Sequence, residues 1–190
     1  MRLHPSSCAP TFYGCALALL VLVALLSPLA SAYAEGTASG EKTLASIAPD
    51  FTAKGLDGRT YKLSELLEKG PVLLSFWTTY CKPCMQEMPE LQKVWDRRKE
   101  AGLTYLGIAC DNSKSVAQVK PKVQSMKFQF PIISDVDQKI MGLYNVRNCP
   151  TTVLIAPDGK ISLFRLGYTK GAEAEIEERI VALLPAGGAK

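Results

Sequence analysis

The stretch "PVLLSFWTTYCKPCMQEMPEL" (Pro71–Leu91) decides the fold, because it joins a buried strand to a long helix through two cysteines. The continuous apolar run "PVLLSFW", which follows a glycine, is typical of a strand that is buried on both faces. Apolar side chains then recur at 4-3-4 spacing over Lys82–Lys99, which predicts an amphipathic helix. The sequence therefore places Cys81 and Cys84 where a central strand ends and a helix begins.

The rest of the chain alternates strand-like and helix-like segments. A hairpin is expected in "FTAKGLDGRTYKL", where Asp-Gly marks the turn. "LTYLGIAC" has the pattern of a second buried strand, and "FPIISD" that of a short extended piece. Helices are expected over 113–126, in "QKIMGLY" and in "GAEAEIEERIVALL", while "TTVLIA" and "KISLFRL" are two strands joined by the turn "PDGK". This order predicts an α/β fold, a three-layer sandwich with a mixed central sheet flanked by helices.

The first 34 residues differ in composition from the rest of the chain. They contain no acidic residue, one arginine, an apolar run from Ala16 to Ala30, and the pattern "AYA" immediately before residue 35. This layout predicts a secretory signal peptide over 1–34, with an uncleaved membrane anchor as the alternative. The small polar residues 35–46 predict a flexible linker, and 47–190 a single domain.

Composition limits the possible partners and chemistry. The net charge of +4 comes from scattered lysines and acids, so no basic block indicates nucleic acid as a partner. The only histidine, His4, lies in the predicted signal peptide, which leaves no imidazole for a metal or a haem-attachment motif, and no cofactor is expected. Export would place the domain in the periplasm or on the outer face of a bacterial cytoplasmic membrane. Disulfides persist there.

Cys81 is expected to be the reactive member of its pair. At a helix N-terminus it faces free backbone N–H groups and the positive end of the helix dipole, which both favour the thiolate. The first cysteine of such motifs can have a pKa as low as about 3.5 to 7.5. Cys84, one turn later, would resolve a mixed disulfide on Cys81. Pro83 suits the first helical turn, and Lys82 adds positive charge beside the thiolate.

Two other interpretations of the cysteines stay open. The Cys81–Cys84 pair could be an inert structural disulfide. Zinc could bind these two residues with Cys110 and Cys149, although zinc sites usually combine two close-spaced couples and the second couple is missing here. The strand, C-x-x-C and helix setting in an exported chain favours redox chemistry.

The motif "FW(x)3CxPC(x)2EMPEL", followed by "PTTVLIAPDGKI", resembles the thioredoxin-like fold and, within it, the TlpA/ResA branch of exported thiol–disulfide oxidoreductases. The resemblance covers nearly all of 47–184, including an inserted segment between the second central strand and the proline. It implies that Cys81 and Cys84 are the redox pair. It also implies that Pro150 is a cis-proline, beside which an extended substrate segment pairs with the backbone.

The resemblance further implies that Glu87 is the acidic residue which this branch uses near the pair. Two positions depart from the pattern: Ser75 stands where thioredoxin has a buried aspartate, and Tyr80 replaces the usual tryptophan. Glu87 is therefore our candidate for moving the proton of Cys84, because partial burial would raise its pKa. A solvated helix glutamate is the alternative. Pro89 should kink the active-site helix.

The implied function is that of an exported reductant. Electrons would pass from a membrane thiol–disulfide donor to Cys81–Cys84, and then to the disulfide of a client protein, such as apocytochrome c or a copper-binding oxidase assembly factor. One alternative is a peroxiredoxin-type thiol peroxidase with antioxidant activity. That class needs P-x-x-x-T/S-x-x-C, and here Pro71 lies ten residues before Cys81 instead of seven. A binding module held together by an inert C-x-x-C is the third class.

Cys149 directly precedes Pro150 and should therefore lie at the active-site edge, where members of the resembled branch commonly have no thiol. We hypothesise that Cys149, with Tyr80, Lys82 and Pro83, faces the substrate. It could form an alternative disulfide with Cys81 or hold a substrate sulfur. A plain buried filler is the other interpretation. Cys110 ends the strand "LTYLGIAC" at the same edge and is expected to be a small buried hydrophobic residue.

Overall fold

A computed structural model describes residues 46–185 of the chain. The predicted signal peptide (1–34) and the predicted linker up to residue 45 lie outside the described residues. Within 46–185, no helix has the length and apolar character needed to cross a membrane.

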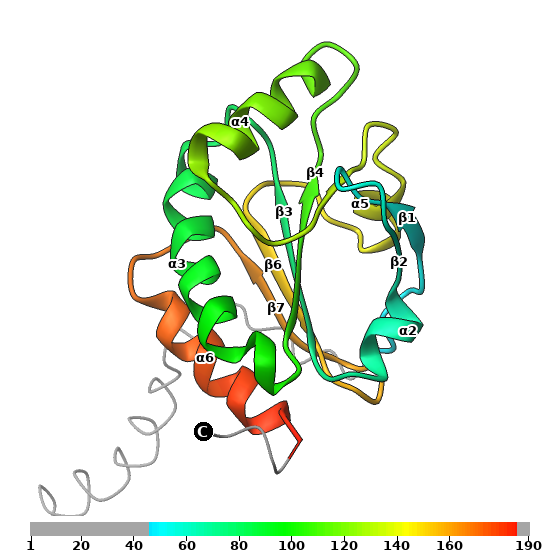
Figure 1. Ribbon diagram of the computed structural model, residues 1–190, viewed down its shortest axis with the longest axis vertical. Helices are drawn as coiled ribbons and strands as arrows, with labels where there is room; N and C mark the ends of the chain where they lie inside the picture. Colours follow the sequence, from blue (N-terminus) through cyan, green and yellow to red (C-terminus); the bar gives the residue numbers. More distant parts are fainter. Residues whose placement is uncertain (1–45, 186–190) are drawn as a thin grey trace, which may run out of the picture. The chain divides into compact units, whose positions relative to one another are not determined.

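A five-stranded mixed sheet, in the order β5-β4-β3-β6-β7, forms the centre of the fold (Figure 1). The strands are β3 (Val72–Trp77), β4 (Thr104–Ala109), β5 (Ile132–Ser134), β6 (Thr151–Ile155) and β7 (Ile161–Leu166). Strand β3 pairs in parallel with β4 and antiparallel with β6. The carboxyl ends of β3 and β4 and the beginning of β6 therefore meet at one edge of the sheet.

Helices cover both faces of this sheet, as the sequence predicts. The helices are α2 (Leu63–Leu67), α3 (Lys82–Arg98), α4 (Val119–Met126), α5 (Lys139–Leu143) and α6 (Ala172–Leu183). Figure 1 shows α3, α4 and α6 on one side of the sheet. The other side carries α2, α5 and a separate hairpin of β1 (Thr52–Lys54) and β2 (Thr60–Lys62).

The alternation of side chains along β3 builds two hydrophobic cores. Leu73 and Trp77 pack with residues of α3 and α6, whereas Leu74 and Phe76 pack with residues of α2 and α5. All six residues of β3 are buried. The strand is therefore fixed from both faces, which gives the loop that follows it a rigid starting point.

Three elements differ from the sequence predictions. Helix α2 was not predicted, because it has five residues of which only Leu63 is buried, too few to show a helical period. The segment predicted as one helix over 113–126 begins with a 3₁₀ turn (Val116–Gln118) before α4. The short extended piece "FPIISD" contains β5, which pairs in parallel with β4 as a full member of the sheet.

Candidate active site

Cys81 and Cys84 form a disulfide at the start of α3. The S–S distance is 1.97 Å, and the two Cα atoms lie 5.3 Å apart. Cys81 is the N-cap residue of the helix, and its sulfur accepts a hydrogen bond from the backbone N–H of Cys84 at 3.2 Å. Cys81 is 9% exposed and lines a cleft, whereas Cys84 is fully buried, so Cys81 is the accessible member of the pair. The hydrogen bond to its sulfur stabilises negative charge on Cys81 once the disulfide is reduced.

The loop between β3 and α3 is held by a residue that sequence reasoning missed. Asp111 is fully buried and accepts hydrogen bonds from both the backbone N–H of Thr79 at 2.9 Å and its hydroxyl at 2.6 Å. These bonds fix the segment directly before Cys81. The sequence offers one indication of this role, because Asp111 stands just after a strand that ends beside β3.

The loop before β6 approaches the same edge from the other side of β3. The peptide bond between Cys149 and Pro150 is cis, and the carbonyl of Pro150 accepts a hydrogen bond from the N–H of Gly167 at 2.8 Å. The hydroxyl of Thr151 donates to the carbonyl of Asn148 at 2.7 Å. Cys149 is half-buried and carries a free thiol.

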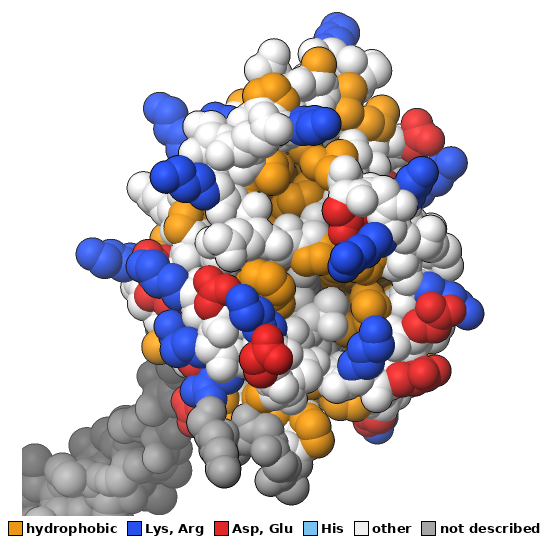
Figure 2. Space-filling view, in the orientation of Figure 1, with side chains coloured by type: hydrophobic (Ala, Val, Ile, Leu, Met, Phe, Trp, Pro, Cys, Tyr) orange, Lys and Arg blue, Asp and Glu red, His pale blue; other side chains and the backbone are white. Residues whose placement is uncertain are grey.

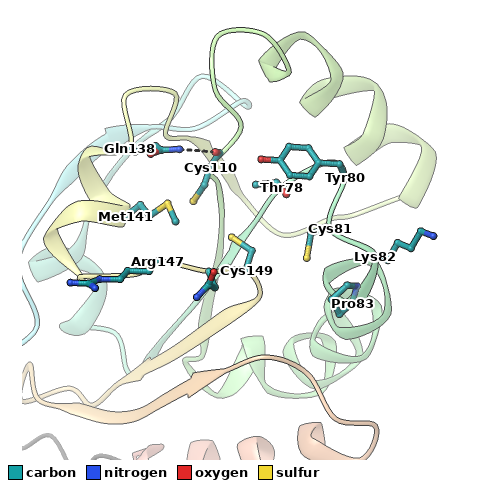
Figure 3. Close-up of a pocket in the computed structure, with 11 residues that line it drawn as sticks. Thr78, Tyr80, Cys81, Lys82, Pro83, Cys110, Gln138, Met141, Arg147 and Cys149 are labelled. Atoms are coloured by element: carbon teal, nitrogen blue, oxygen red, sulfur yellow. Dashed lines mark hydrogen bonds between the residues drawn. The ribbon is translucent and has the colours of Figure 1, made fainter.

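A cleft of about 500 Å³ joins these loops (Figure 3). One wall comes from the start of α3 and the loop before it, and contains Tyr80, Cys81, Lys82 and Pro83. The opposite wall comes from the inserted segment that carries α5 and from the loop before β6, and contains Cys110, Gln138, Met141, Arg147, Asn148 and Cys149. The structure thus brings together in one cleft all four residues that were predicted to face the substrate, and Tyr80 is 69% exposed at its rim.

Glu87 lies beneath the cysteines, on the inner face of α3. It is 1% exposed, which contradicts the alternative of a solvated helix glutamate. Its Oε1 accepts a hydrogen bond from the hydroxyl of Thr152 at 3.0 Å, whereas its Oε2 is buried with no hydrogen-bond partner among the described residues. Burial raises the pKa of Glu87 to about 7, against the lowering effects of the Thr152 hydrogen bond and of Arg165.

The surroundings of Glu87 are polar but incompletely paired. Ser75 lies opposite Thr152 in the register of β3 and β6, and its hydroxyl is buried without a hydrogen-bond partner among the described residues. The Tyr105 hydroxyl is also buried, and desolvation, followed by the nearby Glu87, raises the pKa of Tyr105 well above its usual value. Glu87 is therefore the ionisable group in this buried cluster that can gain or lose a proton near neutral pH.

The described part of the chain contains no cluster of side chains that could hold a metal ion. Residues 46–185 contain no group of three or more histidine, cysteine or acidic side chains placed to hold one ion. Two of the four cysteines considered for zinc are joined to each other by the disulfide.

Several curated proteins are similar in sequence to this chain. Residues 44–164 match the AhpC/TSA family. The thiol–disulfide oxidoreductase ResA of Geobacillus thermodenitrificans is 31% identical over 171 residues, which cover 87% of this chain and 94% of that protein. ResA of Bacillus anthracis is 40% identical over 114 residues, or 60% of this chain, and this chain spans 64% of the length of that relative.

Solved structures share the fold. A proposed thiol:disulfide interchange protein DsbE from Chlorobium tepidum has a TM-score of 0.68 and 27% identity, covering 75% of this chain and 98% of that one. A secreted Mycobacterium tuberculosis disulfide oxidoreductase, described as homologous to E. coli DsbE, has a TM-score of 0.59 and 28% identity. That comparison covers 70% of this chain and 96% of the other.

Proposed function

The chain belongs to the AhpC/TSA family, and from this premise we propose that it is a thiol–disulfide oxidoreductase whose Cys81–Cys84 pair exchanges with disulfides of client proteins. Its fold is thioredoxin-like. The observation that carries the proposal is the disulfide itself. It joins a helix N-cap cysteine at the mouth of a cleft to a fully buried partner one turn later.

The exchange proceeds in two steps. The Cys81 thiolate attacks one sulfur of a client disulfide, which forms a mixed disulfide and releases the other client sulfur as a thiolate. The Cys84 thiolate then attacks the sulfur of Cys81. This step re-forms the Cys81–Cys84 disulfide and releases the client as a dithiol. Cys84 and Glu87 are three residues apart on α3, and both are buried. Glu87 accepts the proton of Cys84 in the second step, because its pKa near 7 suits a general base at neutral pH.

The cleft supplies the binding site for an extended client segment. Tyr80 offers an exposed aromatic surface at the rim, and the backbone on either side of Pro150 lies at the edge where Cys81 opens. Figure 2 shows basic and acidic side chains interspersed over the face in view, with hydrophobic side chains between them. We therefore expect client recognition to depend on backbone pairing and apolar contact more than on net charge.

We place the protein outside the cytoplasm and assign it the reducing direction. Two observations support export. The structurally similar Mycobacterium tuberculosis protein is described as secreted, and residues 1–34 have the sequence pattern of a signal peptide. A membrane thiol–disulfide donor would restore the Cys81–Cys84 dithiol. Apocytochrome c and copper-binding oxidase assembly factors are the client classes that the resemblance to the TlpA/ResA branch suggests.

The direct test is catalysis of disulfide reduction. With dithiothreitol as the electron source, the protein is expected to accelerate the reduction of insulin disulfides, because Cys81 is the more accessible and more nucleophilic thiol. Turbidity of the released insulin chains measures the rate. The same reduced protein should not consume hydrogen peroxide rapidly. Stoichiometric consumption of peroxide without insulin reduction would instead indicate the peroxidase class.

A further inference from the structure

Two thiols outside the C-x-x-C motif converge on the same cleft as Cys81. Cys110 directly follows β4, and Cys149 lies two residues before β6. Because β4 and β6 are the two neighbours of β3, their ends at this edge flank the loop that leads to Cys81. All three cysteines line the one cleft, and Figure 3 shows the sulfur of Cys149 between those of Cys110 and Cys81 in that view.

Cys110 and Cys149 line the same cleft, and their sulfurs point toward each other in the view of Figure 3. The Cys110 thiol donates a hydrogen bond to the carbonyl of Ile108 at 3.5 Å, and the interaction of Cys110 with Cys149 raises the pKa of Cys110 while it lowers that of Cys149. The backbone N–H of Cys110 donates to the carbonyl of Trp77 at 2.8 Å, so the edge of the sheet fixes the position of this residue. Cys110 is 2% exposed, whereas Cys149 is half-buried.

This arrangement repeats the design of the Cys81–Cys84 pair. In each pair one cysteine is the more exposed and is the more acidic or the better stabilised as a thiolate, while the other is more deeply buried. Two thiols at the ends of strands that flank the same strand, and that line one cleft, can form a disulfide when their Cα atoms lie within about 7 Å.

We propose that Cys110 and Cys149 form a second redox-active dithiol, which exchanges with the Cys81–Cys84 disulfide and lets one chain hold four reducing electrons. This second pair depends on the proposed exchange activity of Cys81–Cys84, because its electrons leave the protein through Cys81. Under this proposal Cys110 and Cys149 act as an electron store beside the primary pair and not as inert fillers.

The exchange balances without an external oxidant. After a client disulfide has oxidised the primary pair, the Cys149 thiolate attacks the sulfur of Cys81 and releases Cys84 as a thiolate, which takes up a proton. Cys110 then loses its proton and attacks Cys149, and Cys81 leaves as a thiolate. One disulfide has formed between Cys110 and Cys149, and one has been reduced between Cys81 and Cys84. The primary pair is then ready for a second client disulfide.

Peptide mapping of the oxidised wild-type chain tests the bond itself. Trypsin places Cys110 in residues 100–114 and Cys149 in 148–160. It leaves Cys81 and Cys84 together in 70–93, because the bond between Lys82 and Pro83 resists cleavage. After reduction and stepwise reoxidation with a disulfide buffer, we expect a linked peptide of 100–114 with 148–160. Exclusive linkage within 70–93, or a link between 70–93 and 148–160 alone, would overturn the proposal.

A titration with a synthetic peptide closed by one disulfide tests the electron store. The fully reduced wild-type chain is expected to reduce two equivalents of this peptide, and a Cys110→Ala chain one equivalent, a twofold difference. One equivalent for both chains would contradict the second pair but leave the proposed function intact. Failure of both chains to reduce any peptide would instead remove the proposed function and, with it, the second pair.

Discussion

Replacement of Cys81 by serine is expected to reduce the catalysed reduction of insulin to the rate of dithiothreitol alone, a loss of about three orders of magnitude or more. A serine hydroxyl is not ionised near neutral pH, so no nucleophile remains at the mouth of the cleft. Cys84 cannot replace it, because it is fully buried. Retention of more than a small fraction of the activity by Cys81→Ser would contradict the assignment of Cys81 as the attacking thiol.

Replacement of Cys84 should have a different outcome from replacement of Cys81. In Cys84→Ser the nucleophile is intact but the mixed disulfide cannot be resolved by its usual partner. We therefore expect covalent client adducts that survive non-reducing electrophoresis and disappear with dithiothreitol. The linked peptide should contain residues 70–93. Because Cys149 lies in the same cleft, the double variant Cys84→Ser with Cys149→Ser is expected to accumulate more adduct than the single variant.

Replacement of Glu87 by glutamine should stabilise the protein at alkaline pH. Burial raises the pKa of Glu87 from 4.5 to about 7 in the folded chain. The folded state therefore binds more protons than the unfolded state between these values, and stability falls as the pH rises through this window. At about 1.4 kcal/mol per pH unit, ionised Glu87 costs about 3 kcal/mol above pH 7.

Urea unfolding of the oxidised protein measures this effect. Glu87→Gln should exceed the wild type by about 3 kcal/mol at pH 8 and match it near pH 4, since glutamine keeps the contact with Thr152 but does not titrate. Glu90→Gln is the matched control, because Glu90 lies on the same helix but is partly exposed and pairs with Lys93 at 2.9 Å. Equal pH dependence in the wild type and Glu87→Gln would show that Glu87 does not titrate in this range.

The same variant separates catalysis from stability. If Glu87 takes the proton of Cys84, the rate at which the wild type resolves a mixed disulfide should rise through about pH 7 as Glu87 loses its own proton. Glu87→Gln should lack this rise and be about 100-fold slower above pH 7. Stopped-flow tryptophan fluorescence is a suitable probe, because Trp77 and Trp95 both pack in the same core as Cys84. An unchanged pH profile would leave Glu87 with a structural role.

The central strands and the active-site helix could be predicted because their signals are local and strong. The run "PVLLSFW" has six residues buried on both faces in β3, and the C-x-x-C motif marks the beginning of α3 within one residue. The resemblance to a known family allowed us to expect Glu87 to be partly buried near the cysteines. The residues next to Glu87 in the sequence do not indicate this burial. Short elements such as α2 have too few buried residues to produce a period.

The contacts across the cleft could not be predicted, because they join segments that are far apart in the chain. Asp111 holds Thr79 over a separation of 32 residues, and the bond depends on how two loops leave the sheet. For Cys149 the sequence leaves open a disulfide with Cys81, contact with a substrate sulfur and a filler role, and the structure places it in one cleft with both Cys81 and Cys110. The position of Cys149 depends on the order of β4, β3 and β6 and on the position of the loop before Pro150. No local sequence pattern shows either of these.

The reduction potential of the Cys81–Cys84 pair tests the proposed reductant most directly. Equilibration of the wild-type chain in dithiothreitol buffers, followed by differential alkylation and mass analysis of residues 70–93, reports this pair separately from Cys110 and Cys149. We expect a potential near that of thioredoxin, about −270 mV, which would let the pair reduce client disulfides. A value near about −120 mV, typical of a strong oxidant, would contradict it.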